Sequence, residues 1–389
     1  MKIKNYIISL FIALLIIGMP IQISANKLKD NKVIVEKSDT NLALNRGCIL
    51  VKELKHVNVL NCNADAVNSL NLQPELNLHT LDAGTNSQVR ADLVFSSGNT
   101  GLGRKVVILD SGYNYNHSEL SSSYLGGKDF VNNDFDPLDD LGHGTHVAGL
   151  ITADGINSNA KGVAPGTGII SGKIVNTNGI ASLSTLIDSI YWAVDGNDGV
   201  YGTSDDFNAD AISVSLGTDP PYTYGGYCDD VFPTLTNAVN YAVSKNVAVV
   251  IAAGNHNVQG VSIPGCISSA ITVGAVDNLD NIAYFSARGS ALDVVAPGVN
   301  LVSTWLNNEY TILSGTSMAA PIVTGTIALI KYKHPTYTVM QVRDALTKTA
   351  KDIDVRGFDS NTGYGRIDAY AAVNYSPTKK CVKRCTIAY

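Results

Sequence analysis

Four polar residues of this chain, each set among small or apolar residues, could together activate a hydroxyl group for attack on a carbonyl carbon. They are Asp110 in VVILDSG, His143 in DDLGHGTHVAG, Asn255 in VVIAAGNHN and Ser317 in SGTSMAAP. A serine hydroxyl is a poor nucleophile until an adjacent base takes its proton. The set supplies a nucleophile, a base, a carboxylate to orient that base, and an amide donor for an oxyanion.

Each of the four residues also has an ordinary structural interpretation. A strand-end aspartate such as Asp110 is usually a turn residue or cap, a lone histidine is more often structural, and Gly-Asn is a turn signal. An isolated serine at a helix start is usually an N-cap. We interpret His146, one turn after His143, as structural. The order Asp, His, Ser along the chain is nevertheless a known order for a serine triad, so the whole set favours catalysis.

The elements that must position these residues alternate between strands and helices from Ala91 onward. Buried strands are predicted at 105–110, 169–175, 211–215, 247–253 and 270–275, and helices at 143–153, after Ser182, near 235–242, from Ser317 to Ile330 and after Thr338. The Ser317 run is too long for a strand and lacks alternation. Pro321 is expected in or near its first turn, where its missing N–H would have had no partner. Such alternation predicts a mostly parallel sheet with helices on both faces.

The motifs around these residues resemble those of the subtilisin-like serine peptidases, the subtilases. DSG, HGTHVAG, SVSLG, AAGN and GTSMAAP occur in family order between about Ala91 and Asn374. The resemblance implies an α/β class, three-layer α/β/α sandwich with its site at the carboxyl ends of the strands. It implies that Ser317 is the nucleophile, His143 the general base and Asp110 the residue that orients it. The Asn255 side chain and the Ser317 N–H would form the oxyanion hole.

The same resemblance assigns two groups of substrate contacts. The walls of the pocket for the residue before the scissile bond would be Ser215, Leu216 and Gly217 together with Ala252, Ala253, Gly254 and Asn255. The edge that pairs with an extended peptide would be Gly179, Ile180 and Ala181. No charged residue stands in the pocket segments, so an apolar or broad preference is expected.

The acidic stretch DFVNNDFDPLDD (129–140) is a candidate calcium site. Its possible ligands, at the close spacing of oxygen-ligand loops, are Asp129, Asn132, Asp134 and Asp136. The alternative is a solvated acidic loop. Two residues depart from the family pattern. Glu119 stands where many relatives carry a calcium-binding aspartate, and its partner loop at 154–160 is ambiguous, so a calcium site is not claimed there. Ile322 follows Pro321 where histidine is common.

The start of the chain has the pattern of an export signal. Lys2 and Lys4 precede an apolar run that Pro20 ends, and Ala25 offers a small residue for cleavage. The run is short for a membrane-spanning helix. The net charge is −6, or −8 without the two signal lysines, which disfavours binding to nucleic acid or to anionic membranes. We therefore expect a secreted, extracellular monomer without a stable membrane anchor.

Four segments are expected along the chain. They are a signal peptide at 1–25, a small α+β propeptide-like segment at 26–90, a catalytic domain at 91–376 and a short basic tail with two cysteines at 377–389. The second segment is predicted to hold strands at ILVKEL, NVLNC and ELNLHTL, a helix at ADAVNSL and a polar linker at 83–88. It resembles half of the family's inhibitory propeptide. The expected partners are therefore polypeptide substrates and the chain's own propeptide, acting as an intramolecular inhibitor.

Six cysteines in an exported chain are expected to form disulfides. Fifteen full pairings are possible, and Cys228 with Cys266 is the pair we favour.

The function expected from all these features is secreted serine endopeptidase activity through an acyl-enzyme. The alternatives are a catalytically silent binding protein on the same fold and a processing peptidase restricted to one precursor.

Overall fold

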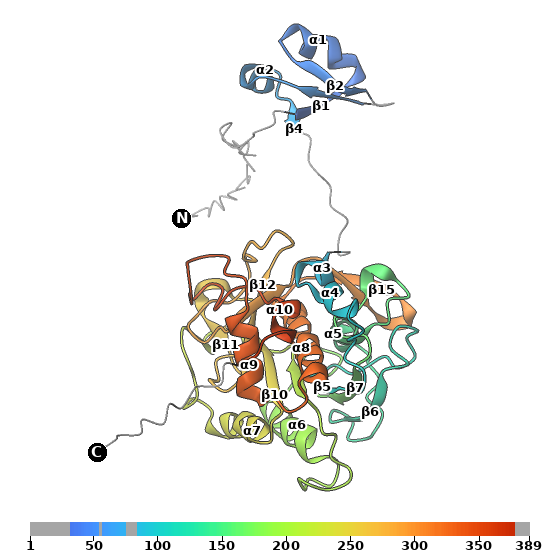
Figure 1. The fold of residues 1–389 in the computed structure, drawn as a ribbon, viewed down its shortest axis with the longest axis vertical. Helices are drawn as coiled ribbons and strands as arrows, with labels where there is room; N and C mark the ends of the chain where they lie inside the picture. Colours follow the sequence, from blue (N-terminus) through green and yellow to red (C-terminus); the bar gives the residue numbers. More distant parts are fainter. Residues whose placement is uncertain (1–31, 54–56, 75–83, 378–389) are drawn as a thin grey trace, which may run out of the picture. The chain divides into compact units, whose positions relative to one another are not determined.

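The computed structural model describes residues 32–53, 57–74 and 84–377 (Figure 1). The chain divides between His79 and Thr80 into two compact units. The export signal, the strand predicted at 75–81 and the cysteines Cys381 and Cys385 lie outside the described residues.

The smaller unit is an antiparallel sheet with two short helices. Its four strands, in the order β2-β3-β1-β4, are β1 (Lys32–Glu36), β2 (Ile49–Glu53), β3 (Val57–Asn61) and β4 (Gln73–Pro74), and its helices are α1 (Thr40–Asn45) and α2 (Ala64–Ser69). Its core is small, and a disulfide joins Cys48 to Cys62 beside it. The sequence predicts β2, β3 and α2, but it does not predict β1 and α1.

The larger unit is built on a seven-stranded sheet in the order β13-β12-β10-β8-β5-β7-β6. Its strands are β5 (Lys105–Asp110), β6 (Tyr124–Asp129), β7 (Gly168–Lys173), β8 (Ala211–Val214), β10 (Ala248–Ala252), β12 (Ile271–Val276) and β13 (Val294–Pro297). Every neighbouring pair is parallel. Two small antiparallel sheets pair β9 (Thr223–Tyr224) with β11 (Val261–Ser262) and β14 (Leu301–Thr304) with β15 (Tyr310–Leu313).

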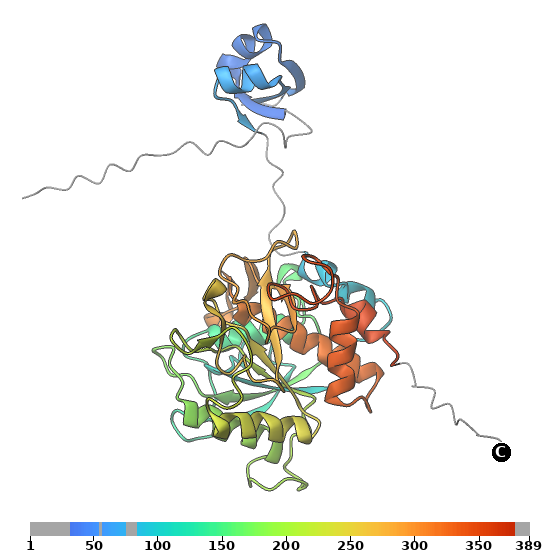
Figure 2. The ribbon, with the colours of Figure 1, turned by 90° about the vertical axis from the view of Figure 1, so that its left-hand side faces the viewer.

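Alternating side chains of the central strands enter two separate cores. Val106 and Ile108 of β5 belong to one core, and Val107 and Leu109 belong to the other, as the two-residue period of a strand requires. The first core contains residues of α5 (His143–Thr152), α8 (Thr316–Lys333), α9 (Val339–Lys348), α4 (Ala91–Phe95) and α10 (Ala369–Val373). The second contains residues of α6 (Leu183–Asp195) and α7 (Pro233–Ser244), drawn in green and yellow in Figure 2. The expected three-layer α/β/α sandwich is confirmed.

The predicted helix caps are confirmed, whereas most of the stretch predicted as a linker is helical. Ser182 caps α6, and Thr338 with Gln341 forms the expected capping box of α9. Residues predicted as linker form α3 (Thr85–Gln88) instead. The side-chain amide of Gln88 donates to the carbonyl of Asp277 and to the carboxylate of Asp280, so tertiary bonds order this polar stretch. Among the described residues, no helix combines the length and apolar character needed to cross a membrane.

Candidate active site

The carboxyl ends of β5, β8 and β10 bring two predicted catalytic residues and one predicted substrate-binding residue to one edge of the sheet. Leu109 of β5 pairs with Val214 of β8, so Asp110 and Ser215 are neighbours at the strand ends. β10 lies on the other side of β8 and leads into Asn255. Adjacent strands are about 4.8 Å apart, so the polar residues that follow them can share one site.

His143, the first residue of α5, is held by the carboxylate of Asp110. The distance from His143 Nδ1 to Asp110 Oδ1 is 2.7 Å, and the Ser111 N–H donates to the same oxygen. Asp110 is 1% exposed, whereas the His143 side chain is 28% exposed. With Nδ1 engaged by a carboxylate, His143 is fixed in the tautomer whose Nε2 can accept a proton.

Competing effects set the proton affinity of His143. Burial lowers its pKa, whereas the charge of Asp110, the hydrogen bond to Asp110 and the charge of Asp139 raise it. The raising effects prevail, so the pKa lies above the ordinary value of 6.5. His143 therefore binds its proton more tightly than a free imidazole does, and it can act as a base only above its raised pKa.

Asp139, which was not singled out from the sequence, organises the start of α5. Its Oδ1 accepts from the N–H groups of Leu141 and Gly142 and from the Ser111 hydroxyl, and its Oδ2 accepts twice from Thr145. The Ser111 hydroxyl in turn accepts from the N–H of Gly144. Asp139 is thus the common anchor of the Asp110 and His143 segments.

Ser317 is the second residue of α8 and exchanges two hydrogen bonds with Ser215. The Ser317 hydroxyl donates to the Ser215 carbonyl over 3.1 Å, and the Ser215 hydroxyl donates to the Ser317 carbonyl over 2.9 Å. The second bond corrects the expectation for Pro321. Because α8 begins at Thr316, an N–H at position 321 would have bonded to the Ser317 carbonyl four residues earlier. Proline leaves that carbonyl free, and Ser215 satisfies it.

The side-chain nitrogen of Asn255 and the backbone nitrogen of Ser317 both lie near Gly315. The Asn255 Oδ1 accepts from the N–H and the hydroxyl of Thr316, which leaves its Nδ2 to donate elsewhere. A Cβ atom added to Gly315 would lie 3.5 Å from Asn255 Nδ2 and 3.6 Å from the Ser317 N. Two nitrogen donors of different origin thus lie near one position, the kind of arrangement that an oxyanion hole uses.

Comparison with known proteins decides the family. The Subtilase family pattern matches residues 101–365. The chain belongs to the subtilase family. A thermophilic serine proteinase from Bacillus sp. (strain AK1) is 39% identical over 274 residues, which cover 70% of this chain and 62% of that proteinase. Subtilisin Savinase from Lederbergia lenta is 37% identical over 286 residues, which cover 74% of this chain and 96% of Savinase. An alkaline protease from Alkalihalobacillus alcalophilus is 37% identical over 286 residues, which cover 74% of this chain and 68% of that protease.

The catalytic unit of this subtilase is therefore a serine-type endopeptidase domain.

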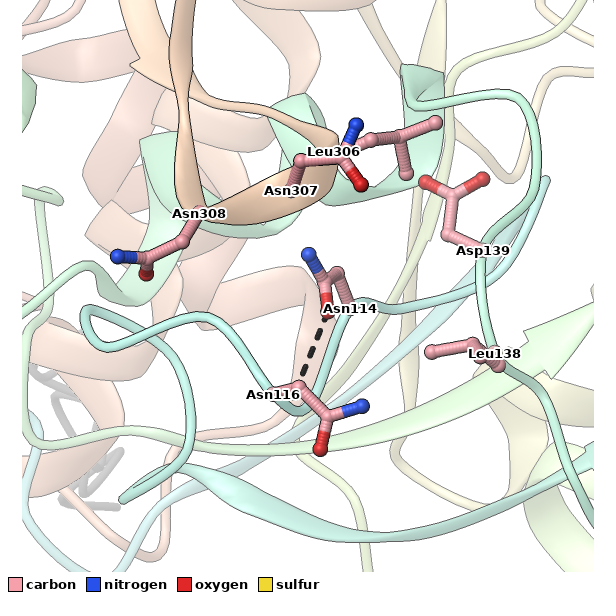
Figure 3. Close-up of a pocket in the computed structure, with 7 residues that line it drawn as sticks. All are labelled: Asn114, Asn116, Leu138, Asp139, Leu306, Asn307 and Asn308. Atoms are coloured by element: carbon pink, nitrogen blue, oxygen red, sulfur yellow. Dashed lines mark hydrogen bonds between the residues drawn. The ribbon is translucent and has the colours of Figure 1, made fainter.

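A pocket of about 330 Å³ opens beside Asp139 (Figure 3). It is lined by Asn114, Asn116, Leu138, Asp139, Leu306, Asn307 and Asn308. The side chain of Asn114 accepts from the N–H of Asn116 in this pocket. None of the residues that the resemblance assigns to substrate binding lines it.

His146 lies in the core beneath the site and has a structural environment. Its Nε2 faces the carbonyls of Leu301 and Thr311, so that nitrogen carries the hydrogen. Burial, and next the charge of His143, lower the pKa of His146 to about 4. It therefore stays neutral wherever His143 can act as a base.

The residues assigned to substrate binding lie in two places. The first group, Ser215 to Gly217, follows β8. In the second group Ala252 is the last residue of β10, and Ala253 and Gly254 follow it. Gly179 and Ile180 are exposed in the turn before α6, with Ile180 63% exposed, and Ala181 is half-buried against the second core. The Asn176 side chain fixes that turn by accepting from the N–H groups of Asn178 and Ile180.

The candidate calcium ligands are engaged by protein groups of their own loop and of neighbouring segments. The carboxylate of Asp129 accepts from Val131 and Asn132, and its Oδ2 lies 4.0 Å from the ammonium of Lys173. Asp134 accepts from the N–H of Asp136, and Asp136 accepts from the Tyr115 hydroxyl and the N–H of Leu138. Within the described ranges, no three acidic, histidine or cysteine residues are arranged to hold a metal ion. The structure therefore does not confirm calcium at this loop.

Glu119 makes contacts that also differ from those of a metal ligand. Its buried carboxylate accepts from the N–H groups of Gly155, Ile156 and Asn157 and from the hydroxyl of Tyr310. The loop at 155–157 therefore turns donors, not carbonyls, toward Glu119. Ile322, a residue of α8, is fully buried in the first core, as expected for an apolar side chain.

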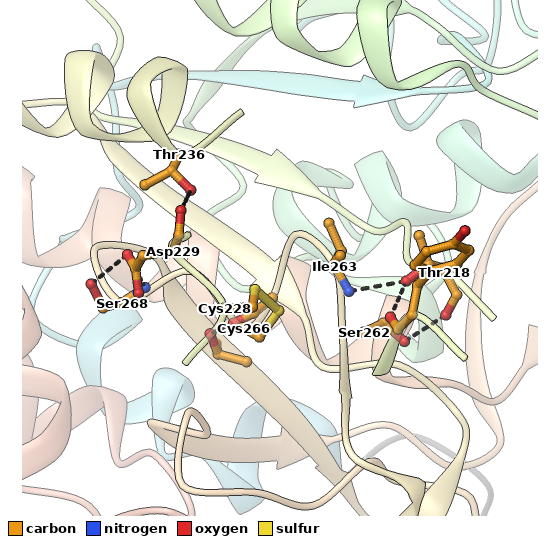
Figure 4. The surroundings of a disulfide bond; sticks show 11 residues. Thr218, Cys228, Asp229, Thr236, Ser262, Ile263, Cys266 and Ser268 are labelled. Carbon is orange, nitrogen blue, oxygen red and sulfur yellow. Dashed lines mark hydrogen bonds between the residues drawn. A yellow bond between two sulfur atoms is a disulfide. The ribbon is translucent and has the colours of Figure 1, made fainter. Parts of the chain in front are cut away.

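A disulfide joins Cys228 to Cys266, the pair that the sequence favoured (Figure 4). Both cysteines are buried, and the Cys228 N–H donates to the Cys266 carbonyl.

Proposed function

We propose that this subtilase is a secreted endopeptidase that hydrolyses peptide bonds of proteins through the triad Asp110, His143 and Ser317 and an acyl-enzyme intermediate. The proposal is supported chiefly by the hydrogen bond between Asp110 and His143. It is supported further by the bond of the Ser317 hydroxyl to Ser215, at the end of the strand next to β5, and by the two nitrogens Asn255 Nδ2 and Ser317 N near Gly315. A silent binding protein would have no need for this full set.

In the proposed reaction the Ser317 hydroxyl turns from the Ser215 carbonyl toward His143 Nε2 by rotation about one side-chain bond. His143 takes its proton as Ser317 Oγ attacks the scissile carbonyl. Asn255 Nδ2 and the Ser317 N–H stabilise the tetrahedral oxyanion. His143 then donates the proton to the departing amine, and Asp110 stabilises the imidazolium that exists between these steps. Water, activated by the same histidine, releases the acyl group.

The proposal is tested by digestion of an unrelated unfolded protein and sequencing of the products. Wild-type protein should cut at many positions, and Ser317→Ala should leave the substrate intact. Cleavage of one precursor only, with no digestion of the unrelated chain, would favour the processing peptidase. No cleavage of either by the wild type would favour the silent binding protein.

The smaller unit is proposed to be an inhibitory propeptide that the enzyme removes itself. The expected cut lies between Leu81 and Ala91, and contacts within the larger unit narrow that range. Gln88 is bonded to Asp277 and Asp280, Val89 is fully buried, and Arg90 forms a 2.6 Å ion pair with Asp368. Residues 88–90 therefore remain with the mature enzyme, and the cut is proposed to precede α3.

Secretion follows in this proposal from the signal pattern at 1–25, and the mature enzyme is proposed to act as a monomer. The calcium site at 129–136 stays a prediction, because binding would require Asp129 and its neighbours to exchange the bonds described above. Thermal melts with calcium and with a chelator test it. An unchanged melting temperature would contradict calcium binding at this site.

A further inference from the structure

One buried lysine, Lys173 at the end of β7, stands beside Asp110. The two residues are partners in the register of the parallel strands β7 and β5. Side chains alternate along a strand, and Ile169 of β7 and Ile108 of β5 both belong to the first core. Lys173 and Asp110 follow these isoleucines by an even number of positions, so both project from that face of the sheet. Lys173 is 2% exposed, and its ammonium therefore needs partners inside the protein.

The closest partners of Lys173 lie on either side of Asp139. Its Nζ donates to the carbonyl of Leu138 over 3.0 Å and lies 2.6 Å from the carboxylate of Asp140. A second carboxylate, that of Asp129, lies 4.0 Å away. The ammonium thus holds the residue before Asp139 by its backbone and the residue after it by its side chain. Both bonds involve a charged donor, which makes them stronger than bonds between neutral groups.

The segment held in this way organises the proposed general base. The carboxylate of Asp139 accepts from the hydroxyl of Ser111, the neighbour of Asp110. It also accepts from the N–H of Gly142, the neighbour of His143. These bonds fix the two members of the Asp110–His143 pair relative to each other. A misplacement of about 1 Å in catalytic geometry can cost about 10²-fold in rate, so the position of this carboxylate matters for the reaction.

We propose that Lys173 is a positioning residue for the peptidase reaction. Its ammonium holds the segment 138–140 and thereby fixes the Asp139 carboxylate. That carboxylate in turn keeps Asp110 and His143 in the geometry that proton transfer needs. Lys173 acts through Asp139 and not on the substrate. This inference rests on the proposed endopeptidase function.

The pH profile distinguishes positioning from a simple effect of charge. The carboxylates of Asp110 and Asp139 raise the pKa of His143, and His146 is the titratable group that faces it from the core. Removing a nearby cation would by itself raise the pKa of His143, because a positive charge disfavours the imidazolium. Loss of positioning would lower that pKa, because both carboxylates would lose their close contact with the histidine and its segment. The two effects therefore have opposite signs.

The test is Lys173→Met, which keeps a long unbranched side chain without the charge. Wild-type and variant enzymes are compared with one chromogenic peptide substrate over a range of pH. Titration with a fluorophosphonate counts the active sites in every sample, so unfolded protein does not lower the measured kcat. The kcat should fall by roughly 10-fold to 10²-fold with KM nearly unchanged. The acid limb of kcat/KM should move to lower pH.

Lys128→Met is the matched control. Lys128 lies on the neighbouring strand β6, and its ammonium lies 4.6 Å from the centre of the Phe130 ring. The same charge is therefore lost without a change to the contacts of the segment 138–140. This variant should keep the wild-type kcat and pH profile.

Asp140→Ala serves if the methionine variant does not fold, since the Asp140 side chain is 44% exposed. It removes one of the two bonds between Lys173 and the segment, so kcat should fall by less than in Lys173→Met. In the Lys173→Met background it should have little further effect, because the bond is already absent.

A wild-type kcat in active Lys173→Met enzyme, or an acid limb that stays in place or moves to higher pH, would overturn the positioning role and leave the proposed function standing. If only Asp140→Ala folds, a wild-type kcat in that variant would overturn it. A wild type that neither reacts with the probe nor cleaves the peptide would overturn the proposed function itself.

Discussion

The Asp110–His143 pair sets the expected pH dependence of the enzyme. A general base must be unprotonated, and the carboxylates of Asp110 and Asp139 hold the pKa of His143 above 6.5. Activity should therefore be lost as the pH falls through a value above 6.5. The profile of kcat/KM against pH measures this value. A rate that stays constant from pH 8 to pH 5 would contradict the role of His143.

Replacing Asp110 with asparagine tests the contribution of the carboxylate to the Asp110–His143 pair. Asp110→Asn removes the charge that raises the pKa of His143, so the acid limb should move to lower pH. The asparagine amide would also favour the wrong tautomer of His143, with a loss of about 10⁴-fold in kcat. Circular dichroism should remain that of the wild type. A variant with normal kcat would show that Asp110 is only a turn residue.

Asn255 is expected to act on the transition state rather than on substrate binding. Asn255→Ala should lower kcat by about 10²–10³-fold, the range found for the corresponding donor of a subtilisin, with KM nearly unchanged. Thr316→Val should reproduce part of this loss, because the Thr316 hydroxyl orients Asn255. Thr316→Ser keeps the hydroxyl and should stay near wild type. Steady-state kinetics separate kcat from KM, and a change confined to KM would contradict an oxyanion-hole role.

The four residues proposed to be catalytic each stand in a short local motif, whereas their supporting residues do not. Asp139 and Thr316 act through hydrogen bonds to segments distant along the chain, 28 residues away for Ser111 and 61 for Asn255. Such bonds leave no local pattern. The one available signal was an aspartate three residues before a glycine at a helix start, which is typical of an Asx turn.

At the scale of elements, the contact between the end of β8 and the start of α8 positions Ser317, the proposed nucleophile. Ser215→Ala removes the donor to the Ser317 carbonyl, and we expect kcat to fall by roughly 10-fold, since a buried carbonyl without a partner costs about 1–3 kcal/mol. Pro321→Ala should restore an intrahelical donor to that carbonyl. The double variant Ser215→Ala with Pro321→Ala should therefore be more active than Ser215→Ala alone. Equal kcat values for the single and double variants would contradict this account.

The elements that the sequence predicted well are long buried strands and capped helices, because their signals are local. β5 matches its predicted range, and α6 begins after the predicted cap Ser182. β6 and β13 were missed. β6 carries two glycines in YLGGKD, and β13 is a four-residue strand ending in proline, both weak strand signals. Their places are set by pairing with β7 and β12.

At the scale of the whole molecule, maturation follows from the proposed activity. In a host without other proteases, secreted wild-type protein should begin between Leu81 and Thr85, as N-terminal sequencing would show. Ser317→Ala should keep the N-terminal unit, because a chain without a nucleophile cannot cut itself. Loss of that unit from the Ser317→Ala protein would refute self-cleavage, although not peptidase activity on other substrates.

The sequence predicted the two-unit organisation and the class of the larger unit. It placed the change between them near residue 90, whereas the chain divides at residue 79. The difference has a physical cause. Val89 is a core residue of the larger unit, and its carbonyl accepts from the N–H of Ala369. A polar stretch such as 83–88 has the composition of a linker, and only its contacts with residues almost 200 positions later reveal where it belongs.

The central claim is that Ser317 is an activated nucleophile, and labelling by a fluorophosphonate probe tests it most directly. The probe phosphonylates a serine only where an adjacent base and an oxyanion hole activate it. Mature wild-type protein should gain one label, which peptide mapping should place on Ser317, and Ser317→Ala should gain none. Absence of label on active, folded wild-type protein, or a label on a different serine, would contradict the account.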